Sequence, residues 1–216
     1  MAWDTERTRA RLLQAAVDEF SARGFSGSNI ERISTRAGIN RERVYAYFGS
    51  KRGLFEAALT DRLVNSIEGV PVTGTGPAAA GAFAEAYFDA CGDDPSLARL
   101  VQWEGLELAA PVDTAGRRER SRAKAAELAT ACRCEDGSAS DDLLWTIVTL
   151  ANGSFAASNL GTIITGDARA DARRASVVRT ARLVAADLIA RAPLEPRGAG
   201  GSDASVSPRD PRSGDV

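Results

Sequence analysis

The stretch 24–54 constrains the fold most, because it reads as two short helices joined by a tight turn. Ser28 is followed three residues later by Glu31, a capping-box pattern that predicts a helix beginning near Asn29. Gly38 supplies the left-handed residue that commonly ends a helix. Two helices joined by a short turn that contains glycine make a helix-turn-helix, the motif that seats a recognition helix in the major groove of DNA.

The second helix of this motif is basic. It is predicted from Arg41 to about Ala46, and Asn40 can cap its N-terminus. Arg41, Arg43 and Tyr45 are expected to point outward from this helix. Because an arginine side chain can pair with two acceptor atoms of guanine, such a helix can read the edges of bases.

The motif resembles the DNA-binding domain of the TetR family of bacterial transcription regulators, over about residues 7–60. The residues that carry the resemblance are Gly24, Phe25, Ile30, Ile33, Ala37, Gly38, Ile39, Tyr45, Tyr47, Phe48, Ser50, Lys51 and Leu54. The resemblance implies an all-α chain with an N-terminal three-helix DNA-binding domain of the helix-turn-helix type. It also implies a C-terminal helical domain for ligand binding and dimerisation.

The residues expected to contact DNA lie on the two short helices and at the start of the next one. They are Ser28, Asn29, Asn40, Arg41, Glu42, Arg43, Tyr45, Tyr47 and Lys51. By resemblance, the two arginines occupy positions that reach bases, and the tyrosines and the lysine match residues that contact phosphates. Glu42 and Arg43 stand where the family more often has small or smaller polar residues. Glu42 could therefore accept from cytosine or orient an arginine, and Tyr47 could instead pack beneath the domain.

Charge is unevenly distributed, although the whole chain carries 27 basic and 29 acidic residues. Residues 1–62 hold 11 Lys and Arg against 8 Asp and Glu, and the remainder has a net charge of −5. A basic N-terminal module on an acidic body agrees with a DNA-binding head and a separate regulatory domain.

The rest of the chain shows helical periodicity and no strand pattern, so the predicted fold class is all-α. The helices are predicted over about 5–23, 50–68, 77–90, 94–108, 114–132, 140–164 and 167–191. We expect a DNA-binding domain over 1–49 and a regulatory and dimerisation domain over 50–192, linked by the helix 50–68. The composition of 193–216 predicts a disordered tail.

Dimerisation is expected through the last two helices, 140–164 and 167–191. The first of these is apolar almost all round, and it has small side chains that permit close approach: Ala151, Gly153, Ala156, Ala157 and Gly161. The alternative is an ordinary buried helix inside a monomer. Because one recognition helix buries too little surface for tight specific binding, we expect a homodimer on a two-fold symmetric operator in double-stranded DNA.

A ligand cavity is predicted around Glu104, which falls in an apolar helix stripe where an unpaired carboxylate is unfavourable. The other residues expected to line it are Phe83, Tyr87, Phe88, Trp103, Trp145, Asn152 and Phe155. Such a cavity would suit a cationic or polar-aromatic compound. The alternative is a normal helical core in which Glu104 pairs with an arginine.

Other classes of function find little support in the sequence. The chain has no histidine, and Cys132-x-Cys134 is too closely spaced for a zinc site, so we expect no metal and no cofactor. No apolar run has membrane-spanning length and residues 1–20 lack a signal-peptide core, so a cytoplasmic location is expected. We predict a DNA-binding transcriptional regulator, a repressor released by a small-molecule effector. A small helical enzyme or a helical adaptor is the alternative.

Overall fold

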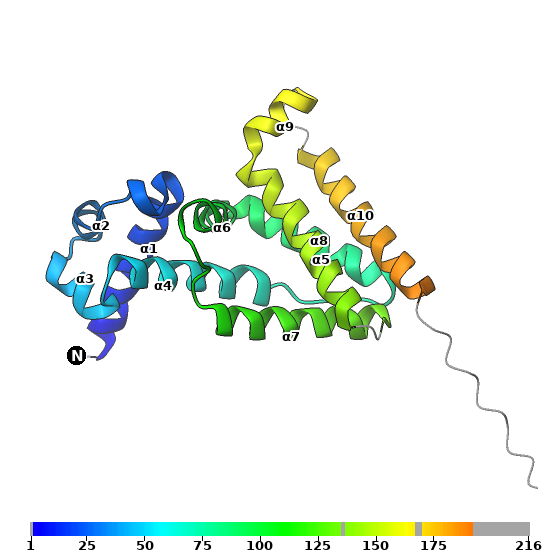
Figure 1. Ribbon diagram of the computed structural model, residues 1–216, viewed down its shortest axis with the longest axis horizontal. Coiled ribbons are helices and arrows are strands. Elements are labelled where there is room, and N and C mark those ends of the chain that lie inside the picture. Colours follow the sequence, from blue (N-terminus) through cyan, green and yellow to red (C-terminus); the bar gives the residue numbers. More distant parts are fainter. Residues whose placement is uncertain (1, 135–136, 167–169, 192–216) are drawn as a thin grey trace, which may run out of the picture.

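The computed structural model describes residues 2–134, 137–166 and 170–191, and every regular element in these ranges is a helix. The predicted all-α fold class is therefore confirmed. Figure 1 shows an elongated molecule with a small helical head at one end and a larger helical body at the other. The tail predicted over 193–216 lies outside the described residues.

The head consists of α1 (Ala2–Gly27), α2 (Ile30–Ala37) and α3 (Arg41–Phe48), and α4 (Lys51–Leu63) closes its core. Apolar residues at helical spacing face inward from each of these helices. The largest fully buried side chains among them are Leu12, Phe20, Ile33, Leu54, Phe55 and Leu59. The first helix begins at Ala2 rather than near residue 5, so it is longer than the sequence predicted.

α1 changes direction at Gly24, whose φ of 73° and ψ of −178° are not helical. A Cβ atom here would lie 2.8 Å from the Glu107 carboxylate and 2.9 Å from the Trp103 ring, both on α6 (Ser96–Glu107). The positive φ and the close approach of α6 together require glycine. This bend directs the chain from α1 into the helix-turn-helix.

The start of α2 is capped by Asn29, whose side-chain oxygen accepts a hydrogen bond from the backbone N–H of Glu31 at 2.7 Å. The predicted capping box between Ser28 and Glu31 is therefore wrong. Ser28 is buried, and its hydroxyl donates to the carbonyl of Phe25 at 2.7 Å. Serine and asparagine are nearly equivalent as caps, so the sequence pattern did not distinguish these adjacent candidates.

The remaining ends of the motif follow the sequence. Gly38 ends α2 in the left-handed conformation, with φ 65° and ψ 38°. Asn40 caps α3 by accepting from the N–H of Arg43 at 3.1 Å, and Ser50 caps α4 by accepting from the N–H of Gly53 at 3.0 Å. These short-range bonds fix the angle at which α3 leaves the head.

The body is built around α5 (Pro77–Asp93), which packs against α7, α8 and α10. Its other helices after α6 are α7 (Thr114–Cys132), α8 (Gly137–Ala156), α9 (Ser158–Thr165) and α10 (Ala170–Arg191). A π-helical turn, η1 (Val64–Glu68), extends α4 out of the head toward the body. In Figure 1, α7 runs below the end of α4 and the segment that follows it, and α9 projects away from the rest of the body.

The single helix predicted over 140–164 is wrong, because the chain breaks at Ala157 (φ −108°, ψ 39°) into α8 and α9. The two helices are bent by 83°. Gly153 and Gly161 flank the break, and glycine is a poor helix former. The prediction of one helix followed the continuous apolar pattern and gave too little weight to these two glycines. Every residue of α9 is exposed or half-exposed, including the apolar Leu160 and Ile163. Within the described ranges no single helix is long and apolar enough to cross a membrane, and α8 with α9 reaches that criterion only as a bent pair.

The head and the body share buried side chains. Leu97 and Leu100 of α6 and Val112 of the following loop are buried in the same cluster as Phe20 of the head. α6 accordingly packs against both α1 and α4. The division of domains at residues 49 and 50 stays a prediction, and α6 is the element of the body that is continuous with the core of the head.

Candidate DNA-binding surface and regulatory cavity

The recognition helix α3 offers three consecutive side chains to solvent at its start. Arg41, Glu42 and Arg43 are all exposed, and the next residue, Val44, is 1% exposed and anchors the helix in the core of the head. Asn40 is exposed as well while it caps the helix. A helix held by one buried residue and presenting basic side chains on its outer face has the geometry of a major-groove reader.

Arg41 is oriented by Tyr45, one turn further along α3. Its Nη2 donates to the Tyr45 hydroxyl at 3.3 Å, and its guanidinium lies 5.4 Å from the centroid of the ring. The hydrogen bond from Arg41 to Tyr45 raises the pKa of the arginine. The side chains of Glu42 and Arg43 make no hydrogen bond to any residue that the structure describes. Arg43 is therefore the freer of the two arginines.

Lys51 has a structural role at the start of α4. Its Nζ donates to the carbonyl of Ser28 at 2.8 Å and lies 4.9 Å from the centre of the Phe25 ring. Burial lowers the pKa of Lys51. Because the Ser28 hydroxyl is itself buried and bonded, the structure gives no support to Ser28 as a phosphate contact. The side-chain oxygen of the adjacent Asn29 accepts the capping hydrogen bond from the N–H of Glu31.

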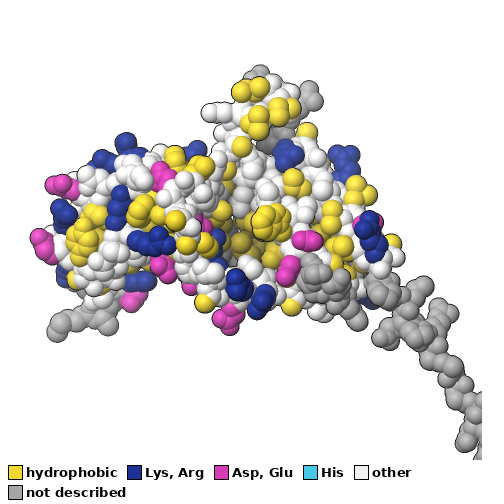
Figure 2. Space-filling model, viewed as in Figure 1, with side chains coloured by type: hydrophobic (Ala, Val, Ile, Leu, Met, Phe, Trp, Pro, Cys, Tyr) yellow, Lys and Arg dark blue, Asp and Glu magenta, His cyan; other side chains and the backbone are white. Residues whose placement is uncertain are grey.

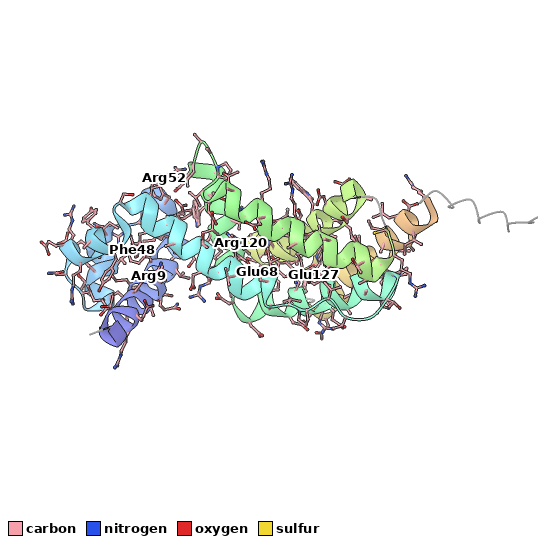
Figure 3. All side chains as sticks on the ribbon, turned by 90° about the horizontal axis from the view of Figure 1, so that it is seen from below. Arg9, Phe48, Arg52, Glu68, Arg120 and Glu127 are labelled. Atoms are coloured by element: carbon pink, nitrogen blue, oxygen red, sulfur yellow. The ribbon has the colours of Figure 1, made fainter. Side chains whose placement is uncertain are left out.

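Tyr47 is half-buried and packs against the core of the head, 6.3 Å from the Phe48 ring between centroids, which is the packing alternative considered for it. Arg9 of α1 lies 5.6 Å from the centroid of the Phe48 ring, and Figure 3 shows both side chains in the head. Arg9 was not among the predicted DNA contacts. The sequence signal for it is the run of Arg7, Arg9 and Arg11 at the start of the first helix.

Glu19 is a further residue of the head that sequence reasoning missed. It is 3% exposed, and its carboxylate accepts from Arg32 Nε at 2.6 Å and from the N–H of Asn29 at 3.3 Å. The pairing joins α1 to the start of α2. A glutamate inside the apolar stripe of the first helix was the available signal.

The eight residues predicted to line a ligand cavity do not form one, because five of them pack together in the core of the body and Trp103, Glu104 and Trp145 lie elsewhere. Phe83, Tyr87 and Phe88 are buried in the core of the body. Tyr87 donates its hydroxyl to the Asn152 side-chain oxygen at 3.3 Å, and Cys91 donates to the same oxygen at 3.4 Å. Burial raises the pKa of Tyr87 and raises that of Cys91 to about 11. These contacts describe a satisfied polar cluster inside a packed core.

Glu104 is 5% exposed and fully paired. Both of its carboxylate oxygens accept from Arg117 Nη1 at 2.7 Å, and one also accepts from the N–H of Val112 at 2.8 Å. Trp103 points toward the head, where its Nε1 donates to the carbonyl of Ser21 at 3.3 Å. The prediction of an acid in an aromatic cavity is wrong, and the arginine pairing considered as its alternative is what the structure contains.

Phe155 belongs to the packed core of the body rather than to a cavity. It packs against Phe88, with 5.0 Å between ring centroids, at the end of α8. Trp145, on the same helix, is 74% exposed. Of the eight predicted residues, Trp145 and Asn152 line a different cavity, on one side of the body.

That cavity has a volume of about 640 Å³ and lies between α4 with η1, α6, α7 and α8. Figure 2 shows the molecule hollowed between head and body on this face. Leu63, Val101, Leu144 and Val148 give it an apolar wall, and α7 contributes four arginines: Arg117, Arg118, Arg120 and Arg122. In Figure 3, Glu68 of η1 and Arg120 of α7 lie near each other in the middle of the molecule. The cavity therefore combines aliphatic side chains with a basic helix.

α6 connects this cavity to the head. Val101 lines the cavity, and Glu107, near the end of the same helix, accepts a hydrogen bond from the N–H of Ser26 at 2.7 Å. After α6, the carbonyl of Ala110 accepts from Arg52 of α4 at 3.2 Å. A movement of α6 relative to α7 would therefore act on the bend that precedes the helix-turn-helix.

Sequence models of known families match two parts of the chain. The model described as "Bacterial regulatory proteins, tetR family" matches residues 12–58, which span most of the head and the start of α4. The model described as "Tetracyclin repressor-like, C-terminal domain" matches residues 80–182, from α5 into α10. The two matches therefore cover both the head and the body.

Individual proteins are similar over the same regions. The chain is 32% identical over 190 residues to the HTH-type transcriptional repressor SCO4008 of Streptomyces coelicolor, covering 85% of this chain and 97% of that protein. It is 50% identical over 58 residues to the HTH-type transcriptional repressor NicS of Pseudomonas putida, covering 27% of each chain. The crystal structure of SCO4942 from Streptomyces coelicolor has a TM-score of 0.64 and 29% identity, and the match covers 82% of this chain and 97% of that one.

Proposed function

Because the chain belongs to the TetR family of bacterial regulatory proteins, we propose that it represses transcription as a homodimer on a palindromic operator and is released by a small molecule. It is a DNA-binding transcriptional regulator and not an enzyme. The observation that carries the proposal is the start of α3, where Arg41, Glu42 and Arg43 are exposed above the buried Val44. Repression is supported by the names of two relatives, both repressors.

Dimerisation is supported by apolar side chains that remain exposed on the last helices. Leu160, Ile163 and Ile164 of α9 and Leu183 of α10 are each more than half exposed. Clustered exposed apolar residues favour a protein contact. A two-fold axis through these helices would place two copies of α3 on one duplex, which is the geometry that a palindromic operator requires.

Release by an effector is supported by the connection between cavity and head. A ligand that prefers one position of α6 would shift the population of head orientations, whereas a ligand indifferent to that position would change nothing. The ion pair of Glu104 with Arg117 and the bond of Glu107 to Ser26 place α6 between the two sites.

Fluorescence anisotropy on labelled duplexes from the DNA beside the gene tests the proposal. Binding should weaken as salt rises, and a duplex with a single half-site should bind more weakly than the full site. Arg43→Ala should weaken specific binding by about tenfold or more, since a two-point contact to guanine is worth about 1–3 kcal/mol.

Arg99→Ala is the matched control, because Arg99 is exposed on α6 and lies outside the head. It should leave DNA affinity unchanged. Equal affinity of the wild type and the Arg43→Ala variant for the full site would contradict a recognition role for this arginine. Absence of salt-sensitive binding to any fragment would contradict the proposed function itself.

A further inference from the structure

The four arginines of α7 that line the cavity divide into two that are paired and two that are not. Arg117 is held by Glu104 at 2.7 Å, and Arg120 pairs with Glu68 at 3.1 Å and also with Asp113. The charges of Arg117 and Arg120 are therefore balanced by neighbouring carboxylates. They shape the wall of the cavity and do not call for a ligand.

Arg118 and Arg122 differ from these. They lie one turn apart on α7, both are exposed, and neither makes an ion pair or hydrogen bond through its side chain within the described part of the chain. Residues four apart on a helix share one face, so the two guanidinium groups can reach the same ligand group. Two unpaired cations at one side of a cavity favour an anion there.

Two carboxylates, Glu68 and Asp141, also line the cavity. Glu68 is already paired with Arg120, whereas Asp141 of α8 lines the cavity and is exposed without an ion pair to a described residue. Setting the paired groups aside leaves the two cations Arg118 and Arg122 against the one carboxylate of Asp141. Because Arg120 has two carboxylate partners, the four arginines are balanced in number by Glu68, Glu104, Asp113 and Asp141, and the unpaired positive charge is local to Arg118 and Arg122.

The rest of the lining is mainly apolar. Leu63, Ile67, Val101, Leu144 and Val148 contribute aliphatic side chains, and Trp145 adds an exposed aromatic ring beside them. A volume of about 640 Å³ is of the size that takes a small molecule rather than a single ion. The preferred ligand should consequently have an apolar body as well as a charge.

We propose that the cavity binds an amphipathic anion, with its acidic head group between Arg118 and Arg122 and its apolar body against the aliphatic wall. This inference names the chemical class of the effector, and it rests on the proposed function. The sequence analysis favoured a cationic or polar-aromatic ligand for an aromatic cavity around Glu104, but Arg117 already neutralises that carboxylate. Guanidinium groups bind carboxylates and phosphates through paired hydrogen bonds, which suits either as the head group.

Isothermal titration of the full-length protein with three ten-carbon probes tests the charge preference. Decanoate, 1-decanol and decylammonium share one apolar chain and differ in the charge of the head group. Decanoate should bind most tightly and decylammonium least tightly, and added salt should weaken the binding of decanoate alone.

Variants then assign the charge preference to residues. The double variant Arg118→Gln with Arg122→Gln should weaken decanoate binding by about tenfold or more and leave 1-decanol binding unchanged, because charge-assisted bonds are lost. Asp141→Asn should tighten decanoate binding. Arg99→Gln with Arg133→Gln removes two exposed arginines that do not line the cavity, so this matched control should behave as the wild type.

The inference is overturned if 1-decanol or decylammonium binds as tightly as decanoate, if decanoate does not bind, or if the double variant binds decanoate normally. Circular dichroism and the DNA affinity of the unliganded variants show whether each is folded. If the protein binds DNA but not decanoate, the proposed class of ligand is wrong and the proposed function is unaffected. Decanoate binding without DNA binding would leave the cavity assignment standing and defeat the proposed function.

Discussion

The head and the body use arginine in contrasting ways. In the head, Arg41 and Arg43 point outward from α3. The cap at Asn40 and the buried side chain of Val44 fix the orientation of this helix. In the body, Arg117 and Arg120 are turned inward and held by carboxylates of other segments. The comparison teaches that the binding surface of the head is set by local sequence. The binding surface of the body depends on which charged side chains remain without an ion pair after Arg117 and Arg120 have paired with carboxylates of other segments.

The two regions nevertheless meet in one core. Leu97 and Leu100 of α6 are buried with Phe20 of α1 and Leu59 of α4. In a fully separate head, Phe20 and Leu59 would have to be covered by other residues of the head. Here α6 of the body helps to cover them. The head and the body therefore differ in how they use charge but share one hydrophobic cluster.

The largest effect is expected from Phe20→Ala. Phe20 is fully buried, and its ring contacts Phe55 edge-on at 5.1 Å between centroids. Removing a buried phenylalanine destabilises a protein by about 3–5 kcal/mol. Because the core is shared through α6, we expect a single calorimetric transition that moves to lower temperature as a whole.

Phe83→Ala is the matched variant in the body, where Phe83 is equally buried. It should lower the same transition by a comparable amount when protein concentrations are equal. An early, separate melting of the head in Phe20→Ala, with the main transition unmoved, would show that head and body are independent despite their contact.

A smaller effect is expected from Glu104→Gln. The amide keeps an oxygen for the N–H of Val112 but removes the negative charge opposite Arg117. Breaking a mostly buried ion pair at one end should lower the free energy of unfolding by about 2 kcal/mol, as measured in urea. The variant should also lose part of the difference in DNA affinity between liganded and unliganded protein, because Glu104 joins α6 to α7.

Glu119→Gln serves as its control, because Glu119 is exposed on α7 and does not line the cavity. It should leave both the stability and the ligand response unchanged. If Glu104→Gln were as stable as the wild type, the pairing with Arg117 would not hold α6 and α7 together.

Most of the head could be predicted from the sequence, because its signals are short-range. Gly38 and Asn40 act within a few residues of their positions, and each was found where the pattern indicated. The exception, Ser28, failed because Asn29 beside it is an equally good cap. Glu19 was missed because the donors of its hydrogen bonds, Arg32 and the N–H of Asn29, lie in and next to α2.

The cavity of the body could not be predicted in the same way. Glu104 could be identified as an unusual buried carboxylate, but the sequence does not say that Arg117 neutralises it. The break at Ala157 redirected the apolar residues of α9 away from the core. Helical periodicity assigns residues to a face of a helix, whereas a cavity depends on how several helices pack, which periodicity does not determine.

The smallest effect is expected at the junction, from Asp94→Asn. Asp94 accepts from the N–H of Ser96 at 3.0 Å and from Arg62 Nη1 of α4 at 3.0 Å, and Arg62 also donates to Gln14 of α1 at 2.6 Å. Burial opposes ionisation of Asp94, but the hydrogen bonds from Ser96 and Arg62 outweigh it and lower the pKa of the carboxyl. Asparagine keeps an oxygen that can accept from the N–H of Ser96, so the substitution removes mainly the ion pair with Arg62.

The sign of the pH dependence follows from that lowered pKa. A carboxyl with a depressed pKa in the folded state stabilises the protein above its unfolded-state pKa, and the contribution is lost as pH falls through the folded-state pKa. Because Asp94 is partly exposed, solvent screening limits the difference between wild type and Asp94→Asn to about 0.5–1 kcal/mol at neutral pH. Urea unfolding at several pH values should show this difference shrinking below about pH 4. Asp93→Asn, on the exposed neighbour, should show no difference at any pH. A difference for Asp94→Asn that persisted in acid would assign its effect to packing and not to charge.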